Sequence, residues 1–448
     1  MTSCCPQIPE ALGKASWIGR VCVGLLLLST ACSGTDHDRP EKRELVVGML
    51  VEQSDTGDTQ KELGAGLLAM RQINAAGGLH IGGVDYQMTV QAQDHQRSAA
   101  GAVAALERLS KQGVTATIGP PWSSLALGMQ PDHSDGASLM ARQFDMLLIS
   151  PSATASAITD LADDDLQWRT IPSDDAQAGI AAAELLSRKL LRAAILYRDD
   201  AWGQGLSKTF QAAFEAGGGV VTAVAGYDAT GEQITDLNVY DFDVELARIF
   251  ADQPDVVLLY NFDEIFQITN RIALGGYLKG YAPLFFGSDA NLTSDLLVNG
   301  APEVIQDMEG TSPVSDDADP YYQQFKDWLK EAELDVADNT AAPRYDAVFC
   351  LAAAMQKADS LQADDIKREL RAVSKKDGDE LDVHAGQWAE ARAALLAGSD
   401  INYDGVSGRI EFSEQGDPTT GLYTIWKVSA GSDNRFSLDL SHTVPFGD

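Results

Sequence analysis

The sequence predicts an α/β fold in which two lobes each contain a parallel sheet. The first reason is length, because 448 residues exceed what one compact core usually holds. The second is pattern, because short apolar strands alternate with helices along most of the chain, as in parallel sheets that helices cover on both faces. The composition is that of an ordinary globular protein, with 45% apolar and 22% charged residues.

The first 31 residues are predicted to form a signal peptide (1–31). Basic Lys14 and Arg20 precede the apolar run 21–28, and small residues follow at 29–31. The apolar run is shorter than a typical transmembrane helix requires. The alternative is a buried N-terminal helix.

Cys32 ends a segment, 28–32, that resembles a bacterial lipobox. In a lipobox the cysteine is acylated and becomes the new N-terminus, so the resemblance implies a lipid anchor on the periplasmic face of the inner or outer membrane. Ser29 departs from the large aliphatic residue that usually stands three places before the cysteine. Residues 32–44 are polar and charged, and we expect them to form a flexible tether.

From residue 45 onward, apolar runs indicate strands, and apolar residues spaced three or four apart indicate helices. Leu63, Leu67, Met70 and Ile73 show the helical spacing, whereas 86–93 alternates as a half-buried strand does. The expected strands are 45–50, 86–93, 116–119, 146–149, 193–197, 218–224, 256–260 and 284–287. The expected helices between them are 61–76, 98–112, 204–216 and 263–275.

The last third of the chain follows a different order. Three helices are expected in a row, and then two strands joined by a turn-rich segment. These elements are the helices 319–333, 343–358 and 364–373 and the strands 409–412 and 422–428. Residues 376–404 are acidic and show no regular pattern, so they are predicted to be an insertion or a long loop.

Charge and motifs argue against several classes of function. The formal net charge of −33 repels phosphate backbones, so we expect no nucleic-acid partner. The sequence has no CxxC pair, HExxH motif, GxSxG elbow or Walker loop. Gly64 and Gly66 fit part of a dinucleotide-binding pattern, but they lie within a predicted helix rather than at a strand-to-helix turn. We therefore expect that the protein is not an enzyme and that it binds neither a metal ion nor a cofactor.

Seven segments, in the same order, resemble the leucine/isoleucine/valine-binding protein family with its type I periplasmic-binding fold. Between about 45 and 430, these segments are 64–66 with 73–78, 118–120 with 123–124, 149–154, 168–170, 201–205, 286–289 and 408–412. The resemblance implies two Rossmann-like lobes joined by a three-strand hinge. Lobe one would hold 44–170 plus 313–375, and lobe two 171–312 plus 405–448.

The same resemblance implies that a ligand lies between the lobes at the carboxyl ends of the strands, as is usual in open α/β sheets. Ser123 and Ser124 would offer hydroxyls and amides at a helix N-terminus to the carboxylate of an amino acid, and Thr154 would add a hydroxyl from the facing loop. That loop also contributes Ala153 and Ser152, whose carbonyl would accept from the ammonium group. The alternative is that the two serines only cap a helix.

Lobe two supplies the remaining candidates. Asp289 would accept from the ammonium group of the ligand, or it caps a helix. Trp202 matches an aromatic residue that covers the ligand, with core packing as the alternative. Asn261 and Phe262 end a strand where the family often has an aromatic residue. Trp122 of lobe one is expected either to shape the pocket or to pack in the core.

The resemblance implies a solute-binding lipoprotein of the cell envelope that captures a small polar metabolite, an amino acid or a close relative. A hinge motion would close the lobes on the ligand, and the permease of an ABC importer would recognise the closed form. The protein is expected to act as a monomer. The alternative is a ligand sensor or receptor ectodomain of the same fold without a role in transport.

Overall fold

The computed structural model describes residues 42–52, 58–129, 140–228, 241–334, 339–431 and 435–447. The predicted signal peptide, Cys32 and the tether up to residue 41 lie outside this part of the chain. Arg43 and Glu44, which the sequence assigns to the tether, already belong to the first strand. Within the described segments, no helix has both the length and the apolar character needed to span a membrane.

A six-stranded sheet forms the centre of lobe one. Its strands, in spatial order, are β2 (Leu79–Ile81), β3 (Val84–Asp94), β1 (Arg43–Val51), β4 (Ala116–Ile118), β5 (Leu147–Ser150) and β6 (Gln167–Arg169). Strand β2 pairs with β3 in the antiparallel sense, and the other pairs are parallel. Strands β4 and β5 are buried along their whole length, which explains why the sequence shows short runs there rather than alternation.

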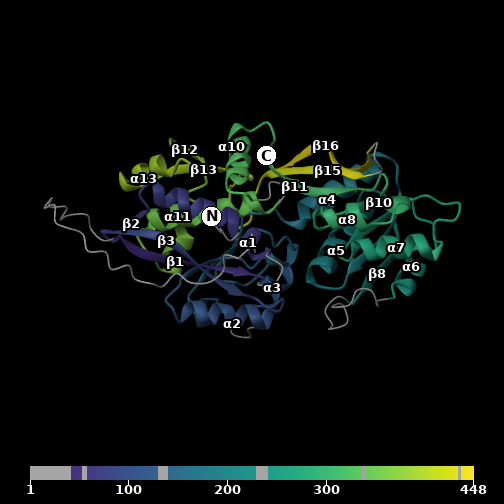
Figure 1. Ribbon diagram of the computed structural model, residues 1–448, viewed down its shortest axis with the longest axis horizontal. Coiled ribbons are helices and arrows are strands. Elements are labelled where there is room, and N and C mark those ends of the chain that lie inside the picture. Colours follow the sequence, from purple (N-terminus) through teal and green to yellow (C-terminus); the bar gives the residue numbers. More distant parts are fainter. Residues whose placement is uncertain are drawn as a thin grey trace, which may run out of the picture. The chain divides into compact units, whose positions relative to one another are not determined.

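Helices lie on both sides of this sheet, with α2 below it and α1 and α11 above it in Figure 1. The helices of lobe one are α1 (Asp58–Ala75), α2 (Ala99–Ser110), α3 (Ser123–Gly128), α10 (Pro320–Glu331), α11 (Ala341–Ala358), α12 (Ala363–Leu370) and α13 (Trp388–Leu396). Helix α11 is buried from Ala341 to Gln356 and packs against α1, α12 and α13. The core of lobe one is therefore assembled from segments that are far apart in the chain.

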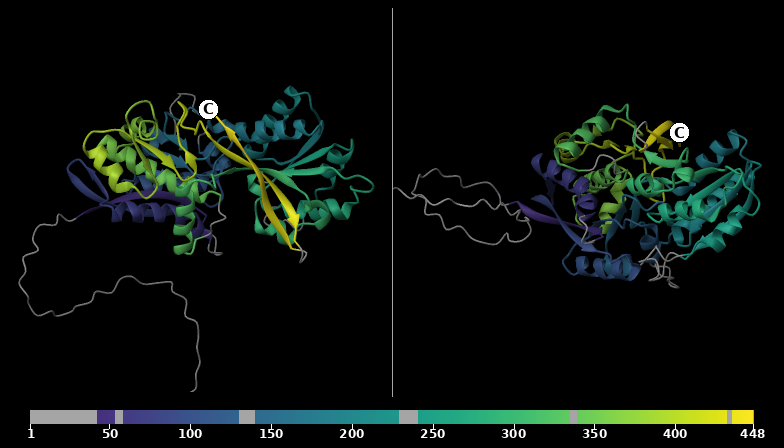
Figure 2. Two further views of the ribbon diagram at one scale, coloured as in Figure 1. Left: turned by 90° about the horizontal axis from the view of Figure 1, so that it is seen from above. Right: turned by 45° about the vertical axis from the view of Figure 1, so that its right-hand side comes forward.

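A seven-stranded sheet forms the centre of lobe two. Its strands, in spatial order, are β16 (Phe436–Phe446), β15 (Gly421–Ala430), β11 (Glu309–Val314), β10 (Leu284–Gly287), β9 (Val256–Tyr260), β7 (Arg192–Arg198) and β8 (Val220–Tyr227). The strands from β11 to β8 are parallel, whereas β15 and β16 form an antiparallel hairpin at one edge, drawn as the long yellow ribbon in Figure 2.

Both faces of the lobe-two sheet are buried by helices. These helices are α4 (Asp174–Ser187), α5 (Ala201–Ala216), α6 (Asp243–Phe250), α7 (Ile265–Gly275), α8 (Ser294–Asn299) and α9 (Pro302–Ile305). Successive residues of the central strand β7 point to opposite faces, so Ala193 and Ile195 join one core with α4 and α5. Ala194 and Leu196 join the other core, with α6 and α7.

Residues 376–404 are not the irregular segment that the sequence suggests. They contain β12 (Leu381–His384), α13 and β13 (Ile401–Gly405). Trp388 of α13 is buried, and its indole Nε1 donates to the carbonyl of Gly78 at 3.0 Å. Tyr403 of β13 stacks on Phe349 of α11, with ring centroids 4.0 Å apart. These contacts make the segment part of lobe one.

Three segments, 170–173, 315–319 and 410–420, connect the two lobes. The borders differ slightly from those implied by the resemblance, because β11 stays in the lobe-two sheet up to Val314 and Phe412 packs in the core of lobe one. The strand expected at 409–412 is shortened to β14 (Gly408–Arg409), which pairs with β13. Both lobes belong to one compact unit that begins at Lys42.

Candidate ligand-binding cleft

A cavity of about 680 Å³ lies between the two lobes. Its walls come from the residues that follow β1, β4 and β5 in lobe one and β7, β9 and β10 in lobe two. The cavity therefore lies at the carboxyl ends of parallel strands in both sheets, the usual ligand position in open α/β folds. Of the nine predicted ligand-binding residues, the following six line it: Ser123, Ser152, Thr154, Trp202, Phe262 and Asp289.

Two adjacent loops form a large part of the lobe-one wall, and hydroxyl groups tie them together. The Ser123 hydroxyl oxygen, at the start of α3 just after the loop that follows β4, accepts from the amide of Ala155 at 3.0 Å. The Ser152 hydroxyl, on the loop after β5, donates to the carbonyl of Pro121 at 2.8 Å. Ser123 and Thr154 are almost fully buried, so their positions are set by packing as well as by these bonds.

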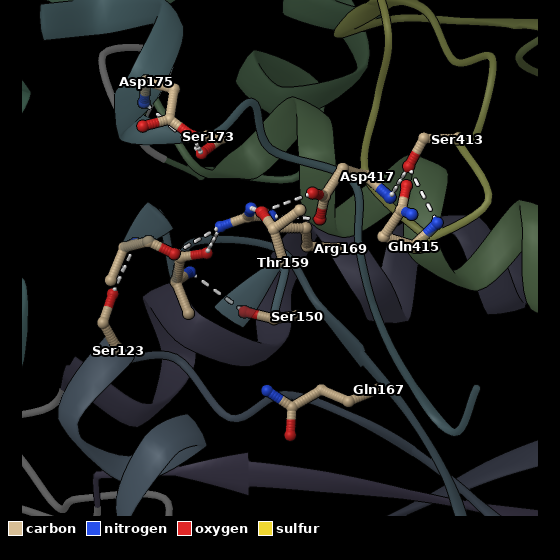
Figure 3. Close-up of polar contacts among 12 residues, drawn as sticks. Ser123, Ser150, Thr159, Gln167, Arg169, Ser173, Asp175, Ser413, Gln415 and Asp417 are labelled. Carbon is tan, nitrogen blue, oxygen red and sulfur yellow. Dashed lines mark hydrogen bonds and ion pairs between the residues drawn. The ribbon is translucent and has the colours of Figure 1, made fainter. Parts of the chain in front are cut away.

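Arg169, at the end of β6, supports the loop after β5 from behind (Figure 3). Its buried side chain donates from Nη1 to the carbonyl of Ala155 at 3.0 Å, from Nη2 to Thr159 Oγ1 at 2.6 Å and from Nε to Asp417 Oδ1 at 2.6 Å. Thr159 Oγ1 in turn donates to Asp417 Oδ2 at 2.7 Å. Asp417 belongs to the third connecting segment, so one guanidinium group joins a cleft loop to the hinge.

Asp289 stands at the start of a short 3₁₀ turn after β10. The preceding residue, Ser288, is the N-cap of this turn and donates from its amide to Oδ1 of Asn291 at 2.9 Å, so Asp289 is not the capping residue. Its Oδ1 accepts from Nε2 of Gln177 at 2.9 Å, and Gln177 Nε2 also contacts the carbonyl of Thr311 at 3.2 Å. Burial raises the pKa of Asp289, and the hydrogen bond from Gln177 partly offsets that rise.

Aromatic rings form part of both walls. Trp202 and Phe262 of lobe two stack with centroids 4.7 Å apart, and the guanidinium of Arg198 lies 4.9 Å from the centre of the Phe262 ring. Trp122 of lobe one also lines the cavity and makes an edge contact with His95, at 4.9 Å between centroids. Trp202 is only 4% exposed and packs in the lobe-two core, and it also lines the cleft.

Three of the predicted residues do not line the cavity. Ser124 lies on α3, one residue beyond the cavity-lining Ser123. Ala153 is packed in a small apolar cluster with Ala126. Asn261 is fully buried in lobe two, where its Nδ2 donates to the hydroxyl of Tyr227 at 3.0 Å.

Sequence reasoning missed most of the charged groups in the cleft. Glu52, directly after β1, pairs with Arg97, whose Nε lies 2.7 Å from Glu52 Oε1. Glu52 also donates from its amide to Oε2 of Glu62 at 2.6 Å. Arg344, near the start of α11, donates from Nη2 to Thr340 Oγ1 at 2.8 Å. The rule that ligands bind at strand ends could have identified Glu52.

Asp174, the first residue of α4, lies behind the cleft and was also missed. Its amide donates to the carbonyl of Thr154 at 2.8 Å, which joins lobe two to a lobe-one cleft loop. Its carboxyl is fully buried, and the nearby Thr154 hydroxyl offsets only part of the cost of ionising it. Burial, and secondarily the charge of Asp289, raise the pKa of Asp174 to about 8. The carboxyl therefore holds its proton at neutral pH.

The described part of the chain contains no group of three or more His, Cys, Asp or Glu side chains that could hold a metal ion. Cys350 is a buried free thiol in α11, in agreement with its apolar surroundings in the sequence. Burial raises its pKa well above the ordinary value, which keeps the thiol protonated.

Comparisons with known proteins point to one family. The family model described as "Receptor family ligand binding region" matches residues 61–431. The leucine-, isoleucine-, valine-, threonine- and alanine-binding protein of Pseudomonas aeruginosa is 25% identical over 317 residues, which are 70% of this chain and 78% of that protein. The chemotactic signal transduction system substrate-binding protein BasB of Halobacterium salinarum is 24% identical over 347 residues, 74% of each protein.

Solved structures share the fold. The leucine-binding protein LivK of Thermotoga maritima matches with a TM-score of 0.67 at 17% identity, over 90% of this chain and 98% of that chain. A solute-binding protein of R. palustris, solved with 4-hydroxybenzoate, matches with a TM-score of 0.68 at 15% identity and the same coverage. These likenesses confirm the predicted fold class of two α/β lobes with largely parallel sheets.

Proposed function

The chain belongs to the family described as "Receptor family ligand binding region". We therefore propose that it captures a small polar metabolite, an amino acid or a close relative, in the cleft between its lobes. The observation that carries the proposal is the cavity of about 680 Å³ at the strand ends. It has hydroxyl groups on the lobe-one wall and a carboxylate on the lobe-two wall. Such a volume lies within the range of roughly 300–1,000 Å³ that is typical of small-molecule pockets.

The two walls suit the two ends of a zwitterion. The Ser123 oxygen already accepts a hydrogen bond from the amide of Ala155, so its own O–H remains to donate to a ligand carboxylate. Thr154 offers a second hydroxyl in the same loop pair. Asp289 accepts from the ligand ammonium, and the ammonium charge lowers the cost of ionising this buried acid. Trp202 and Phe262 cover the ligand side chain.

The cellular role that we propose is delivery to an ABC importer from outside the cytoplasm. The Pseudomonas aeruginosa relative is named as an amino-acid-binding protein, and the family resemblance implies a permease that recognises the closed form. Acylation of Cys32 would hold the protein at the periplasmic face of the inner or outer membrane, with 32–44 as a tether, and the protein would act as a monomer.

A sensor role is the second candidate, and the Halobacterium salinarum relative favours it, because its name places it in a chemotactic signalling system. The two roles share the ligand site and differ in the partner. Co-purification with an ABC permease would support delivery, whereas co-purification with a chemotaxis receptor would support sensing.

A thermal-shift screen of purified residues 33–448 against metabolites tests the binding function. A ligand present at a hundredfold its Kd adds about 2.7 kcal/mol to the free energy of unfolding. Asp289→Ala should abolish or strongly reduce the shift caused by amino acids, because the ammonium group loses its acceptor. Asp252→Ala is the matched control, since Asp252 is exposed and precedes β9, at the end of the strand away from the cleft. An unchanged calorimetric affinity in the Asp289 variant would reject its assigned role.

The anchor is tested separately by Cys32→Ser in cells that are fed radiolabelled palmitate. The wild-type protein should be labelled and sediment with membranes. The variant should lose the label and the membrane association, and persistent labelling of the variant would exclude acylation at this residue.

A further inference from the structure

Two tryptophans line the cleft from opposite lobes. Trp122 ends the loop after β4 in lobe one, and Trp202 is the second residue of α5 in lobe two. Trp122 is also the N-cap of α3, and α3 contacts α5 across the boundary between the lobes. The two indoles therefore lie at the starts of helices that touch each other, and closure of the lobes narrows the space between the rings.

The indole of lobe one is fixed by its backbone and by a second ring. The Trp122 carbonyl accepts from the amides of Leu125 and Ala126, at 3.1 and 3.0 Å. Its ring makes an edge contact with the buried imidazole of His95. Because His95 Nδ1 accepts from the amide of Arg97 at 3.1 Å, the imidazole that supports Trp122 is itself held in one orientation.

The indole of lobe two belongs to a stack of planar groups. Trp202 stacks on Phe262 with an interplanar angle of 24°, and the guanidinium of Arg198 lies 4.9 Å from the centre of the Phe262 ring. Arg198 donates to Asp200 Oδ2 at 2.8 Å and to Glu264 Oε1 at 3.0 Å. These contacts make the lobe-two wall a preformed aromatic surface, so a ligand that packs against it pays little for ordering the rings.

We infer that the ligand carries a flat aromatic ring, which closure of the lobes places between Trp122 and Trp202. This inference rests on the proposed binding function and specifies its ligand class as the aromatic amino acids. Trp122 directly precedes Ser123, so the ring would lie next to the hydroxyl that we assign to the ligand carboxylate. Asp289, which lines the cavity from the same lobe as Trp202, remains the acceptor for the ammonium group.

Two facing indoles favour an aromatic side chain over an aliphatic one of the same size. Burial of apolar area stabilises both kinds of side chain in proportion to that area. Each stacked or edge-to-face pair of aromatic rings adds roughly 2- to 13-fold in affinity beyond the burial of area. A flat ring between Trp122 and Trp202 forms two such pairs, whereas an aliphatic side chain forms none. The ring contacts are thus the part of the affinity that separates the two ligand classes.

Isothermal titration calorimetry on the purified protein measures this difference with three probes: L-phenylalanine, β-cyclohexyl-L-alanine and L-leucine. The second probe has the carboxylate, the ammonium group and the six-membered carbon ring of the first, but its ring is saturated and puckered. We expect L-phenylalanine to bind at least about fivefold more tightly than its saturated analogue, close to the lower limit for two ring pairs. It should also bind more tightly than L-leucine.

Variants of the two tryptophans test whether these rings cause the preference. In Trp122→Leu and in Trp202→Leu, the ratio of the two Kd values for L-phenylalanine and its saturated analogue should fall at least about twofold, because one ring pair is lost. Trp122→Phe should restore most of the ratio. Trp328→Leu is the control, since Trp328 of α10 is half-buried and does not line the cavity, and it should leave the ratio unchanged. Melting temperatures without ligand check that each variant folds.

The outcomes separate this inference from the function on which it rests. Equal affinity for L-phenylalanine and its saturated analogue, or tighter binding of L-leucine, overturns the ligand class and leaves the binding function intact. An unchanged ratio in folded Trp122→Leu also overturns it. If L-phenylalanine does not bind, the ligand class is overturned, and the binding function falls with it if the metabolite screen also finds no ligand.

Discussion

Replacing Asp174 by asparagine should flatten the dependence of stability on pH. The wild-type carboxyl is fully buried, and its pKa is raised from 3.8 to about 8. Between these values the unfolded chain has lost the proton that the folded protein keeps. The contribution of this carboxyl to stability is therefore fully present below pH 3.8 and is lost as the pH rises toward 8. Asparagine has nearly the same shape and cannot ionise, so this contribution disappears.

The magnitude follows from the size of the pKa difference. Each pKa unit corresponds to about 1.36 kcal/mol, so a rise from 3.8 to about 8 corresponds to an upper limit of about 6 kcal/mol over the whole range. Roughly 4 kcal/mol of this falls between pH 5 and pH 8, where the protein can be studied. The wild-type protein should lose up to this amount over that interval, beyond what the variant loses.

Urea unfolding at pH 5, 6.5 and 8 measures this difference for the wild type, Asp174→Asn and the exposed control Asp252→Asn. Burial also raises the pKa values of Asp163 and Asp346, each to about 6, but both residues are present in all three proteins. Subtracting the variant from the wild type therefore isolates Asp174. The reasoning is refuted if Asp174→Asn loses as much stability as the wild type between pH 5 and pH 8.

Two further predictions concern stability. Arg169→Leu should lower the free energy of unfolding by about 3–5 kcal/mol, because it leaves Asp417 without its buried partner, and a loss below about 1 kcal/mol in urea would contradict this. Gly203→Ala should destabilise by roughly 1–3 kcal/mol, since its Cβ would lie 2.0 Å from the carbonyl oxygen of Arg198. Gly205 lies in the same helix with open space around it, so Gly205→Ala should stabilise the protein by about 0.5–1 kcal/mol. If the melting temperatures of the Gly203→Ala and Gly205→Ala variants shifted in the same direction, this account would be wrong.

The sequence pattern predicted the helices and strands that are strongly apolar. It missed those in which buried and exposed positions differ little in hydrophobicity. Strands such as β9 (Val256–Tyr260), buried at every position, stand out as apolar runs. In β12 only Val383 is buried, so no alternation is visible in a charged neighbourhood. Helix α4 is rich in alanine, which gives little contrast between its two faces. Strand β16 does alternate in the sequence from Phe436 to Leu440, and this signal could have identified it.

The candidate site was predictable where it follows strand ends and not where it depends on long-range folding. Ser123, Thr154 and Asp289 follow strands that the sequence shows clearly, and all three line the cavity. Arg344 reaches the same cavity from the start of α11, almost two hundred residues beyond the cleft loops of lobe one, and no local pattern indicates that approach. Asp174 was missed for a similar reason, since its environment is created by residues of both lobes.

The interleaved composition of the lobes has a consequence for biosynthesis. Lobe one buries Phe412, and the sheet of lobe two is completed by β15 and β16, so neither core can close until nearly all of the chain has been made. Domains that are continuous in sequence can fold one after another as they emerge from the ribosome. Here neither lobe can complete its core until most of the chain has been synthesised, so the nascent chain stays unfolded for most of that time. For the same reason, no single truncation point yields one intact lobe.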